Sequence, residues 1–414
     1  MDRMPSSHTR KKRLGGKLLA QGLYGCVFNP PLYCSNGTKA TDNKVSKLMR
    51  MNNAISEFAT AKKIIHKIPD INEYSKYFIL PDTKCASRTD QTNTNVKKCL
   101  DDMETMLGKP PVELLRSPVL LGMNVGGIDL KKFIDTYNQT RIPITFGNTV
   151  QFIKFFRDLI KCTEVLQDKF IIHNDLHSKN VMVGMDGVPR IIDFGRTFHV
   201  GSELDIVDTI NNYYRLFNAD ISGKFLQFSP EFIMLCEVLH NPSENQQTTI
   251  DAVMKNEILG TDDNHKIHRK LHKAYMEFVH NIIRPATMRT GRISKSSLIR
   301  NWIREYWIKQ DVWAIGMIVR DIIINTQIWR DFNRSTGQDI VDKFSRIISK
   351  MTDPDPATRI DSKDALRRID SLLKKSQESH AVPPQSARST QSAGYQRPHT
   401  PCCLRRTRRK NTVR

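Results

Sequence analysis

The sequence predicts an α+β protein with two lobes, a small β-rich one followed by a larger α-helical one. Residues 18–49 contain short apolar runs of the kind that form strands. Residues 54–68 space their apolar side chains at helical intervals, and helical spacing dominates beyond about residue 149. A polar stretch at residues 83–95 resembles an insertion. With 414 residues the chain can bury a sizeable core, and we expect the lobes at residues 18–121 and 122–375.

Both ends of the chain are basic and poor in residues that can be buried. Residues 1–17 hold six Lys/Arg against one Asp, and residues 376–414 hold eight against one Glu, so the tails carry over half of the net charge of +21. The second tail is rich in Ser, Gln and Pro. We predict that both tails are disordered. They are either solubilising appendages or arms for docking, nuclear targeting or contact with nucleic acid, and such contact would occur only through them.

The cysteines and the apolar runs bear on the cellular setting. Eight cysteines are scattered without a C-x-x-C pair, so we expect neither a zinc ribbon nor a disulfide framework, and a reducing intracellular setting. The N-terminus lacks an apolar segment, and the apolar run at residues 312–324 is interrupted by Arg320 and Asp321. We therefore predict no signal peptide and no membrane span.

Two short polar turns follow strand-like runs in the middle of the chain. In "FIIHNDLHSKNVMV", residues 170–183, Asp175 and Asn180 lie between two apolar runs, and "PRIIDFG" ends another run at Asp193. Loops braced by a rigid scaffold often hold chemistry. One carboxylate near a reacting hydroxyl, with an amide and a second carboxylate to bind a cation, is what phosphoryl transfer requires. These three residues therefore predict a phosphotransfer centre.

The two turns resemble motifs of the protein kinase superfamily, whose catalytic loop reads H-R-D-L-x-x-x-N and whose metal motif reads D-F-G. The chain is most similar in character to the divergent serine/threonine kinases of large nucleocytoplasmic DNA viruses. The resemblance implies that Asp175 accepts the substrate hydroxyl proton, that Asn180 and Asp193 hold Mg²⁺, and that ATP is the donor. It also implies an intracellular protein, in the cytoplasm or nucleus of a host cell or packaged in a virion.

Upstream, "LLAQGLYGCVF" resembles the glycine-rich loop that covers the ATP phosphates in this family. Gly22, Gly25 and Val27 match the pattern, and Tyr24 is the aromatic residue at the tip of the loop. Ala20 replaces the first glycine of the pattern. Glycines suit this task because backbone N–H groups approach phosphate closely only where no Cβ intervenes. The resemblance therefore assigns this segment to ATP binding.

The next two segments resemble the family's lysine strand and its hinge. "KVSKLM" makes Lys47 the expected partner of the α- and β-phosphates, with Lys44 as the alternative. Glu57 on the following helix would pair with Lys47; a solvated surface glutamate is the other interpretation. "LLGMNVGGIDLKKFI" resembles the hinge, so adenine would meet the backbone near residues 122–125 and Asp129 would reach the ribose.

Three later segments extend the resemblance to about residue 370. "SPEF" resembles the A-P-E motif and includes Glu231, "DVWAIGMIV" resembles the central helix and includes Asp311 and Trp313, and "DPDPATRI" includes Arg359. In the family the glutamate and the arginine pair. We therefore expect a buried Glu231–Arg359 ion pair that clamps the substrate platform to the large lobe.

Several departures from the family pattern carry predictions of their own. Asn174 replaces the arginine that grips an activation-segment phosphate, so activity need not wait for phosphorylation there. His177 stands where serine/threonine kinases place a lysine near the γ-phosphate, which makes it a candidate catalytic residue with a pH-dependent charge. Residues 235–305 are expected to be a large insertion. Hydroxyls at Thr209, Tyr213 and Tyr214 are possible phosphorylation sites.

The predicted fold is a bilobal protein-kinase-like fold, with a small β-rich lobe carrying one regulatory helix and a larger α-helical lobe. The predicted reaction transfers the γ-phosphoryl group of ATP, with Mg²⁺, to serine or threonine hydroxyls of protein substrates. Because "DLH" also resembles aminoglycoside and choline kinases, a small-molecule phosphotransferase is the first alternative. A kinase-like scaffold without activity is the second, and a basic nucleic-acid-binding protein is the third. The sequence gives no indication of oligomeric state.

Overall fold

The computed structural model describes most of the chain between residues 16 and 380. The described residues are 16–22, 25–38, 44–87, 94–107, 117–140, 148–202, 206–207, 227–240, 264–326, 329, 331 and 338–380. The tip residue Tyr24, the hydroxyls of Thr209, Tyr213 and Tyr214, residues 1–15 of the first expected tail, residues 381–414 of the second and residues 241–263 of the expected insertion lie outside them.

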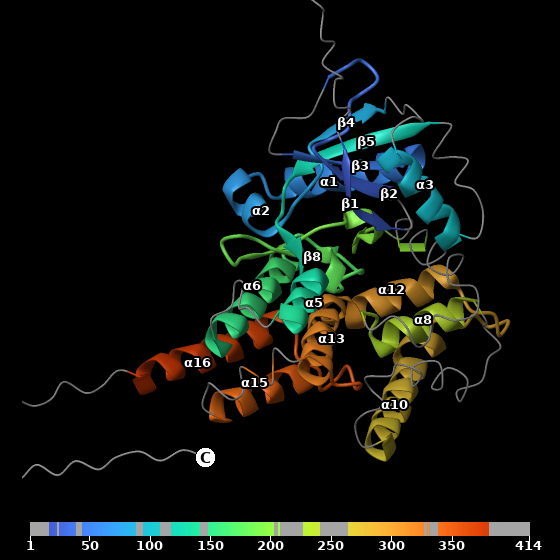
Figure 1. The fold of residues 1–414 in the computed structure, drawn as a ribbon. Coiled ribbons are helices and arrows are strands. Elements are labelled where there is room, and N and C mark those ends of the chain that lie inside the picture. The colour runs from blue at the N-terminus through green and yellow to red at the C-terminus, as the bar shows by residue number, and fades with distance from the viewer. Residues whose placement is uncertain are drawn as a thin grey trace, which may run out of the picture.

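The N-terminal lobe is built on a five-stranded antiparallel sheet with the order β1-β2-β3-β5-β4 (Figure 1). Its strands are β1 (Lys17–Gly22), β2 (Gly25–Asn29), β3 (Lys44–Arg50), β4 (Thr83–Ala86) and β5 (Pro118–Asn124). Side chains alternate between the two faces of each strand. In β3, Val45 and Met49 join one apolar cluster and Leu48 joins another, so both faces of the sheet are covered.

Helix α1 (Met51–Lys67) covers one face of this sheet, as the helical spacing at residues 54–68 predicts. Its buried positions are Ala54, Glu57, Ala61 and Ile64, which recur every three or four residues and therefore share one side of the helix. A short helix, α2 (Ile71–Tyr77), follows it. The one polar member of the buried side, Glu57, is thereby directed into the protein.

The other face of the sheet is covered by a further helix of this lobe, α3 (Thr94–Leu107), which the sequence did not predict. The polar stretch at residues 83–95 contributes β4 and the start of α3. The expectation of a single helix in this lobe is therefore wrong. Val96, Cys99 and Met103 of α3 pack with Phe28 and Leu48 of the sheet. The low apolar content between residues 83 and 95 hid β4, and α3 itself consists mostly of polar residues.

Two disulfides tie this region together, contrary to the expectation of no disulfide framework. Cys26 of β2 bonds to Cys99 of α3, and Cys34 bonds to Cys85 of β4. The partners are 73 and 51 residues apart in sequence, so spacing motifs give no sign of them. Disulfides persist mainly in oxidising environments. The cysteines therefore no longer argue for a reducing setting, and the intracellular location stays a prediction.

The C-terminal lobe is larger and mainly helical (Figure 1). Its helices are α5 (Leu130–Thr140), α6 (Thr149–Gln167), α8 (Pro230–His240), α10 (Asn264–Phe278), α12 (Lys295–Tyr306), α13 (Gln310–Asn325), α15 (Gln338–Met351) and α16 (Ser362–His380). Short strands β6 (Ile128–Asp129), β8 (Val181–Val183) and β9 (Pro189–Ile191) pair in one small sheet, and β7 (Ile171–Ile172) pairs with β10 (Phe198–His199). These strands lie where the loops of interest begin and end.

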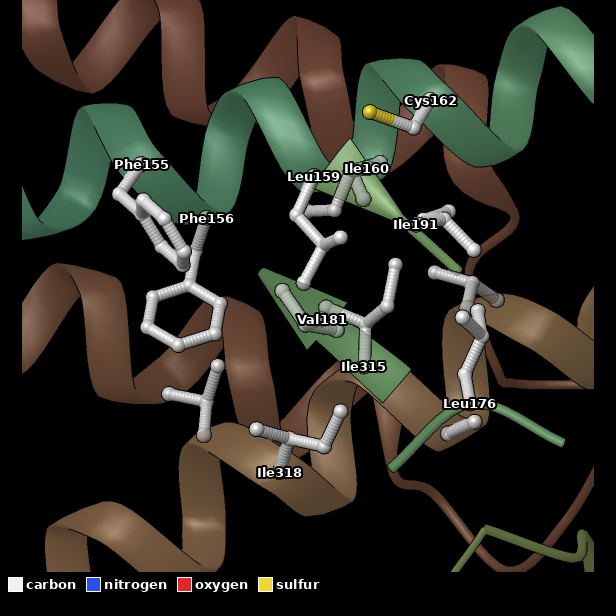
Figure 2. Packing of buried hydrophobic residues seen from close by; sticks show 14 of the residues in the cluster. Phe155, Phe156, Leu159, Ile160, Cys162, Leu176, Val181, Ile191, Ile315 and Ile318 are labelled. Atoms are coloured by element: carbon white, nitrogen blue, oxygen red, sulfur yellow. The ribbon is translucent and has the colours of Figure 1, made fainter. Parts of the chain in front are cut away.

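The core of this lobe holds the small sheet between helices. Figure 2 shows Phe156 and Leu159 of α6 extending toward Val181 of β8, with Ile315 of α13 in the same cluster. These side chains are fully buried. Because this interior is close-packed, the ends of β7, β8 and β9 have little room to move. The turns that connect these strands are therefore held in fixed positions.

The region around residues 235–305 packs on the lobe through its own apolar cluster and two ion pairs. Trp302 of α12, Phe278 of α10 and Phe232 of α8 are buried together. Lys270 Nζ lies 2.9 Å from Asp353 Oδ2, and Lys273 Nζ lies 2.7 Å from Asp355 Oδ2. Helix α10 is therefore held to the loop between α15 and α16.

The described elements reach into both expected tails. Strand β1 begins at Lys17, the last residue of the first expected tail. Helix α16 runs to His380, five residues into the tail that we expected to begin at residue 376. Among the described residues, no helix has both the length and the apolar character needed to cross a membrane.

Candidate active site

The loop after β7 is held by a buried carboxylate from α13. Asp311 accepts hydrogen bonds from the backbone N–H groups of His173 at 2.9 Å and Asn174 at 3.0 Å. Asn174 has a φ of 59°, in the left-handed region that non-glycine residues rarely adopt. Burial raises the pKa of Asp311 to about 6, and the two N–H donors oppose that rise. The carboxylate thus supports an unusual turn directly before Asp175.

Asp175 is buried and receives hydrogen bonds from three segments of the chain. Arg196 Nη1 lies 3.3 Å and Gln227 Nε2 lies 3.2 Å from Oδ1. Asn180 Nδ2 donates to the Asp175 carbonyl at 2.9 Å and lies 3.5 Å from Oδ2. Burial raises the pKa of Asp175 to about 7, Asp193 adds to the rise, and Arg196 and Gln227 oppose it. A buried carboxylate of this kind is suited to accept a proton near neutral pH.

Lys47 joins the two lobes at this site. Its Nζ donates to Glu57 Oε2 at 2.8 Å and Oε1 at 3.0 Å, and to Asp193 Oδ1 at 3.1 Å. Burial opposes the charge of Lys47, but Asp193 and Glu57 outweigh burial and raise its pKa. Although burial acts to raise the pKa of Asp193, Lys47 holds it below the ordinary value. The three side chains form one charged cluster.

Strand geometry explains why Lys47 and not Lys44 reaches the cluster. Lys47 shares a strand face with Val45 and Met49, which is the face that α1 covers. Lys44 points to the other face and pairs with Asp82 at the rim of the sheet. The buried position of Glu57, which is 3% exposed, differs from that of a solvated surface glutamate.

Phe194 packs the second turn against both lobes. Its ring contacts His173 edge-on at a centroid distance of 4.9 Å and Phe78 at 5.8 Å. Asp193, directly before it, has a left-handed φ of 63°. This backbone conformation directs the Asp193 carboxylate toward Lys47 while Phe194 stays buried, which is the kind of local strain found at functional sites.

The glycine-rich segment is described on both sides of its tip. A Cβ on Gly25 would lie 2.1 Å from the Leu48 carbonyl oxygen, so only glycine allows β2 to approach β3 there. Ala20 is exposed and Val27 is half-buried in the paired strands β1 and β2. A Cβ on Gly22 would lie 4.0 Å from the Gly25 carbonyl oxygen, an ordinary contact distance. Contact of these residues with phosphate stays a prediction.

The segment after β5 leads from one lobe to the other. Gly127 has a φ of +103°, and a Cβ there would lie 2.2 Å from the Val183 carbonyl oxygen. Asp129 Oδ1 accepts from the backbone N–H of Lys132 at 2.8 Å, which caps the first turn of α5. That role occupies one carboxylate oxygen of Asp129; its expected contact with ribose stays a prediction.

His177 differs from the expectation of a histidine that titrates near neutrality. Its Nδ1 accepts from the backbone N–H of Lys179 at 3.2 Å, so the ring takes part in the turn before Asn180. Burial lowers the pKa of His177 to about 4, and Arg196 and Lys179 lower it further against the pull of Asp193. His177 is therefore uncharged near pH 7 and supplies no cation there.

Asn180 and Asp193 offer oxygen ligands that fit Mg²⁺. The Nδ2 group of Asn180 is used by Asp175, which leaves its side-chain carbonyl oxygen as the ligand atom. Asn180 and the strand before Asp193 are held together, since the Ile192 N–H donates to the Asn180 carbonyl at 3.0 Å. Asp193 stays ionised because its pKa is lowered. An amide oxygen and a carboxylate are ligands that Mg²⁺ prefers.

Two contributors to the site were not found from the sequence. Arg196 directly follows Gly195 of the D-F-G motif, and Gln227 precedes the S-P-E motif. A polar network continues from Gln227, whose carbonyl accepts from Gln310 Nε2 at 3.4 Å, while Gln310 Oε1 accepts from Ser229 Oγ at 2.6 Å. In the sequence, the only indication of either residue was that the charged Arg196 lies next to the D-F-G motif.

Comparison with known proteins gives one short similarity. A segment of 54 residues is 39% identical to a protein of Dictyostelium discoideum described as a probable serine/threonine-protein kinase. The segment covers 13% of this chain and 8% of that protein. No family model matches the chain. The similarity hints at a kinase-like transferase.

Proposed function

We propose that this protein is an ATP-dependent protein kinase that phosphorylates serine or threonine hydroxyls. The observation that carries the proposal is the contact of Lys47 with both Glu57 and Asp193, in a site where Asp175 and Asn180 are also buried. A lysine placed between two carboxylates is held in position for the phosphates of a nucleotide. Phosphoryl transfer depends mainly on such positioning and electrostatics.

Each side chain has a distinct task in this proposal. Lys47 orients the α- and β-phosphates of ATP, and Glu57 fixes Lys47. Asp175 accepts the proton of the substrate hydroxyl as the substrate oxygen bonds to the γ-phosphorus and ADP leaves. Asn180 and Asp193 would hold Mg²⁺, which neutralises charge on the phosphate oxygens when bound. The pKa of Asp175, raised to about 7, favours its role as a base near neutral pH.

The platform for a protein substrate is the part of the proposal that distinguishes it from a small-molecule kinase. Glu231 of α8 and Arg359 form a buried ion pair, and α8 follows the segment in which Gln227 donates a hydrogen bond to Asp175. The ion pair therefore holds α8, and with it the segment next to Asp175, in a fixed position. It supports a protein acceptor, whereas the "DLH" sequence alone supports the small-molecule alternative.

Transfer of label from radiolabelled ATP tests the proposal directly. Full-length protein is incubated with Mg²⁺ and with basic and acidic acceptor proteins, and the labelled residues are identified by mass spectrometry. We expect label on serine or threonine with the wild type and none with D175A or D193A. Label on the acceptor with D193A would contradict the assignment. Preferential phosphorylation of amino sugars or choline in competition would favour the small-molecule alternative, and absence of transfer to any acceptor would favour a scaffold.

A further inference from the structure

The two oxygens of the Asp175 carboxylate differ in their surroundings. Oδ1 accepts from Arg196 Nη1 at 3.3 Å and from Gln227 Nε2 at 3.2 Å. Oδ2 has, among the described residues, the longer 3.5 Å contact with Asn180 Nδ2. Two donors on one oxygen fix the plane of the carboxylate, because rotation about its bond to Cβ would break both hydrogen bonds.

The two donors to Oδ1 come from parts of the chain that have separate tasks. Arg196 follows the D-F-G turn, and its side chain is 15% exposed. Gln227 lies before α8, is 7% exposed, and is tied to α13 through Gln310. Burying a guanidinium or an amide is costly unless it is hydrogen-bonded. Their burial against one carboxylate oxygen therefore indicates a built arrangement.

This chain has His177 two residues after Asp175, where serine/threonine kinases place a lysine. A positive charge beside Asp175 must therefore come from another residue. The Nδ1 atom of His177 accepts a hydrogen bond from the Lys179 N–H, so this ring is engaged within the catalytic loop. The only cation that contacts Asp175 within the described part of the chain is Arg196. The positive charge beside the base thus comes from the metal-binding turn instead of the catalytic loop.

We propose that Arg196 and Gln227 are positioning residues that hold Oδ1 of Asp175, so that Oδ2 is the oxygen that accepts the substrate proton. This inference rests on the proposed function. The substrate O–H bond breaks and its proton moves to Oδ2. The substrate oxygen then bonds to the γ-phosphorus of ATP, and the bond from that phosphorus to the bridging oxygen breaks, leaving ADP with the electron pair. Gln227 links this geometry to the segment beside the substrate.

Steady-state transfer from ATP to a labelled acceptor protein tests the inference with the full chain. R196A and Q227A should lower kcat by about 10–100-fold while the KM for ATP changes by less than about threefold, since misplacing a reacting group costs about this much. R196K should retain more activity than R196A, because it keeps the charge but not the planar donor pair. R157A is the matched control: this arginine of α6 pairs with Asp370 at the surface.

Chemical rescue separates positioning from a structural effect. Guanidinium at millimolar concentration should raise kcat of R196A several-fold and leave the wild type and R157A unchanged, at ionic strength matched with sodium chloride. A kcat of R196A within about twofold of the wild type, or a loss that appears only in KM, overturns the inference. If thermal unfolding shows that R196A is not folded, the kcat values of Q227A and R196K test the inference instead. The same criteria of a twofold change in kcat and a loss confined to KM then apply.

Failure of the inference is distinguishable from failure of the proposed function. If the wild type transfers phosphate and D175A does not, the proposed function stands, and an unaffected R196A then refutes only the role of Arg196. If neither the wild type nor any variant transfers phosphate, or if D175A is as active as the wild type, the proposed function fails and the inference fails with it.

Discussion

Arg359 and Glu231 form a buried two-point ion pair across 128 residues of sequence. Arg359 Nη1 lies 2.6 Å from Glu231 Oε1, and Nη2 lies 2.9 Å from Oε2. Each residue is 2% exposed. The guanidinium also lies 4.6 Å from the centre of the Trp313 ring, and its Nε donates to the Asp353 carbonyl at 2.9 Å. The pair joins α8 to the loop before α16 and to α13.

Removal of one partner of this pair should destabilise the protein strongly. E231A or R359A leaves a buried charge without its partner, so we expect the free energy of unfolding to fall by about 3–5 kcal/mol. Denaturation in urea measures this change. The double variant E231M/R359M removes both charges and should cost less than either single variant. R157A, at an exposed pair, should cost less than about 1 kcal/mol. Equal costs for E231A and R157A would contradict the prediction.

Replacement of Lys47 should remove catalysis. K47M deletes the ammonium that Glu57 and Asp193 hold, so we expect kcat/KM for ATP to fall by at least about 10²-fold. K44M is the matched control from the same strand, because Lys44 pairs with Asp82 outside the cluster. Kinetics with radiolabelled ATP measure both. A larger loss in K44M than in K47M would contradict the assignment.

Stability should depend on pH through the buried ring of His173. Burial lowers the pKa of His173 to about 4. The Ile192 carbonyl and Asp193 act to raise this pKa, and His177 lowers it further. Below about pH 6.5 the unfolded chain binds a proton at this histidine that the folded protein does not, so its contribution to stability is lost as the pH falls. Between pH 7 and pH 5 the loss is about 2 kcal/mol for this group alone.

The comparison of wild type with H173Q isolates this contribution. Asp311, which contacts the His173 backbone N–H, has a pKa raised to about 6 and acts in the opposite direction, because the folded protein gains its proton first on acidification. Asp311 is present in both proteins and cancels in the difference. Thermal unfolding from pH 7 to pH 5 should show a smaller loss of stability for H173Q. The same slope in both proteins would refute the prediction.

The two disulfides should stabilise the N-terminal lobe. Each closes a loop of more than 50 residues, for which about 2–4 kcal/mol of stabilisation is expected. The double variant C26A/C99A should therefore unfold at lower temperature than the wild type in the absence of reductant. Alkylation of denatured protein should count at least four more thiols after reduction. An unchanged thiol count would show that these bonds do not form.

Local sequence was sufficient for the elements that carry the candidate site. The apolar runs around residues 170–183 and 189–193 predict the short strands that bracket Asp175, Asn180 and Asp193, and the structure has β7, β8 and β9 there. The helical spacing at residues 54–68 predicts α1. Such patterns are readable because strand and helix periods are set by neighbouring residues. Local periodicity did not reveal β4 and α3, because their sequences are mostly polar. The apolar side chains of α3 find their packing partners on the distant strands of the sheet.

The sequence by itself determined which residue types are present to transfer phosphate and the order in which they occur along the chain. Tertiary structure decided which of two lysines meets Glu57, that Cys26 bonds to Cys99, and that Arg196 and Gln227 share one oxygen of Asp175. The burial that leaves His177 uncharged was decided there too. The physical reason is distance along the chain: hydrogen bonds and ion pairs between residues tens to hundreds of positions apart form only when packing brings them together, and no local period records them.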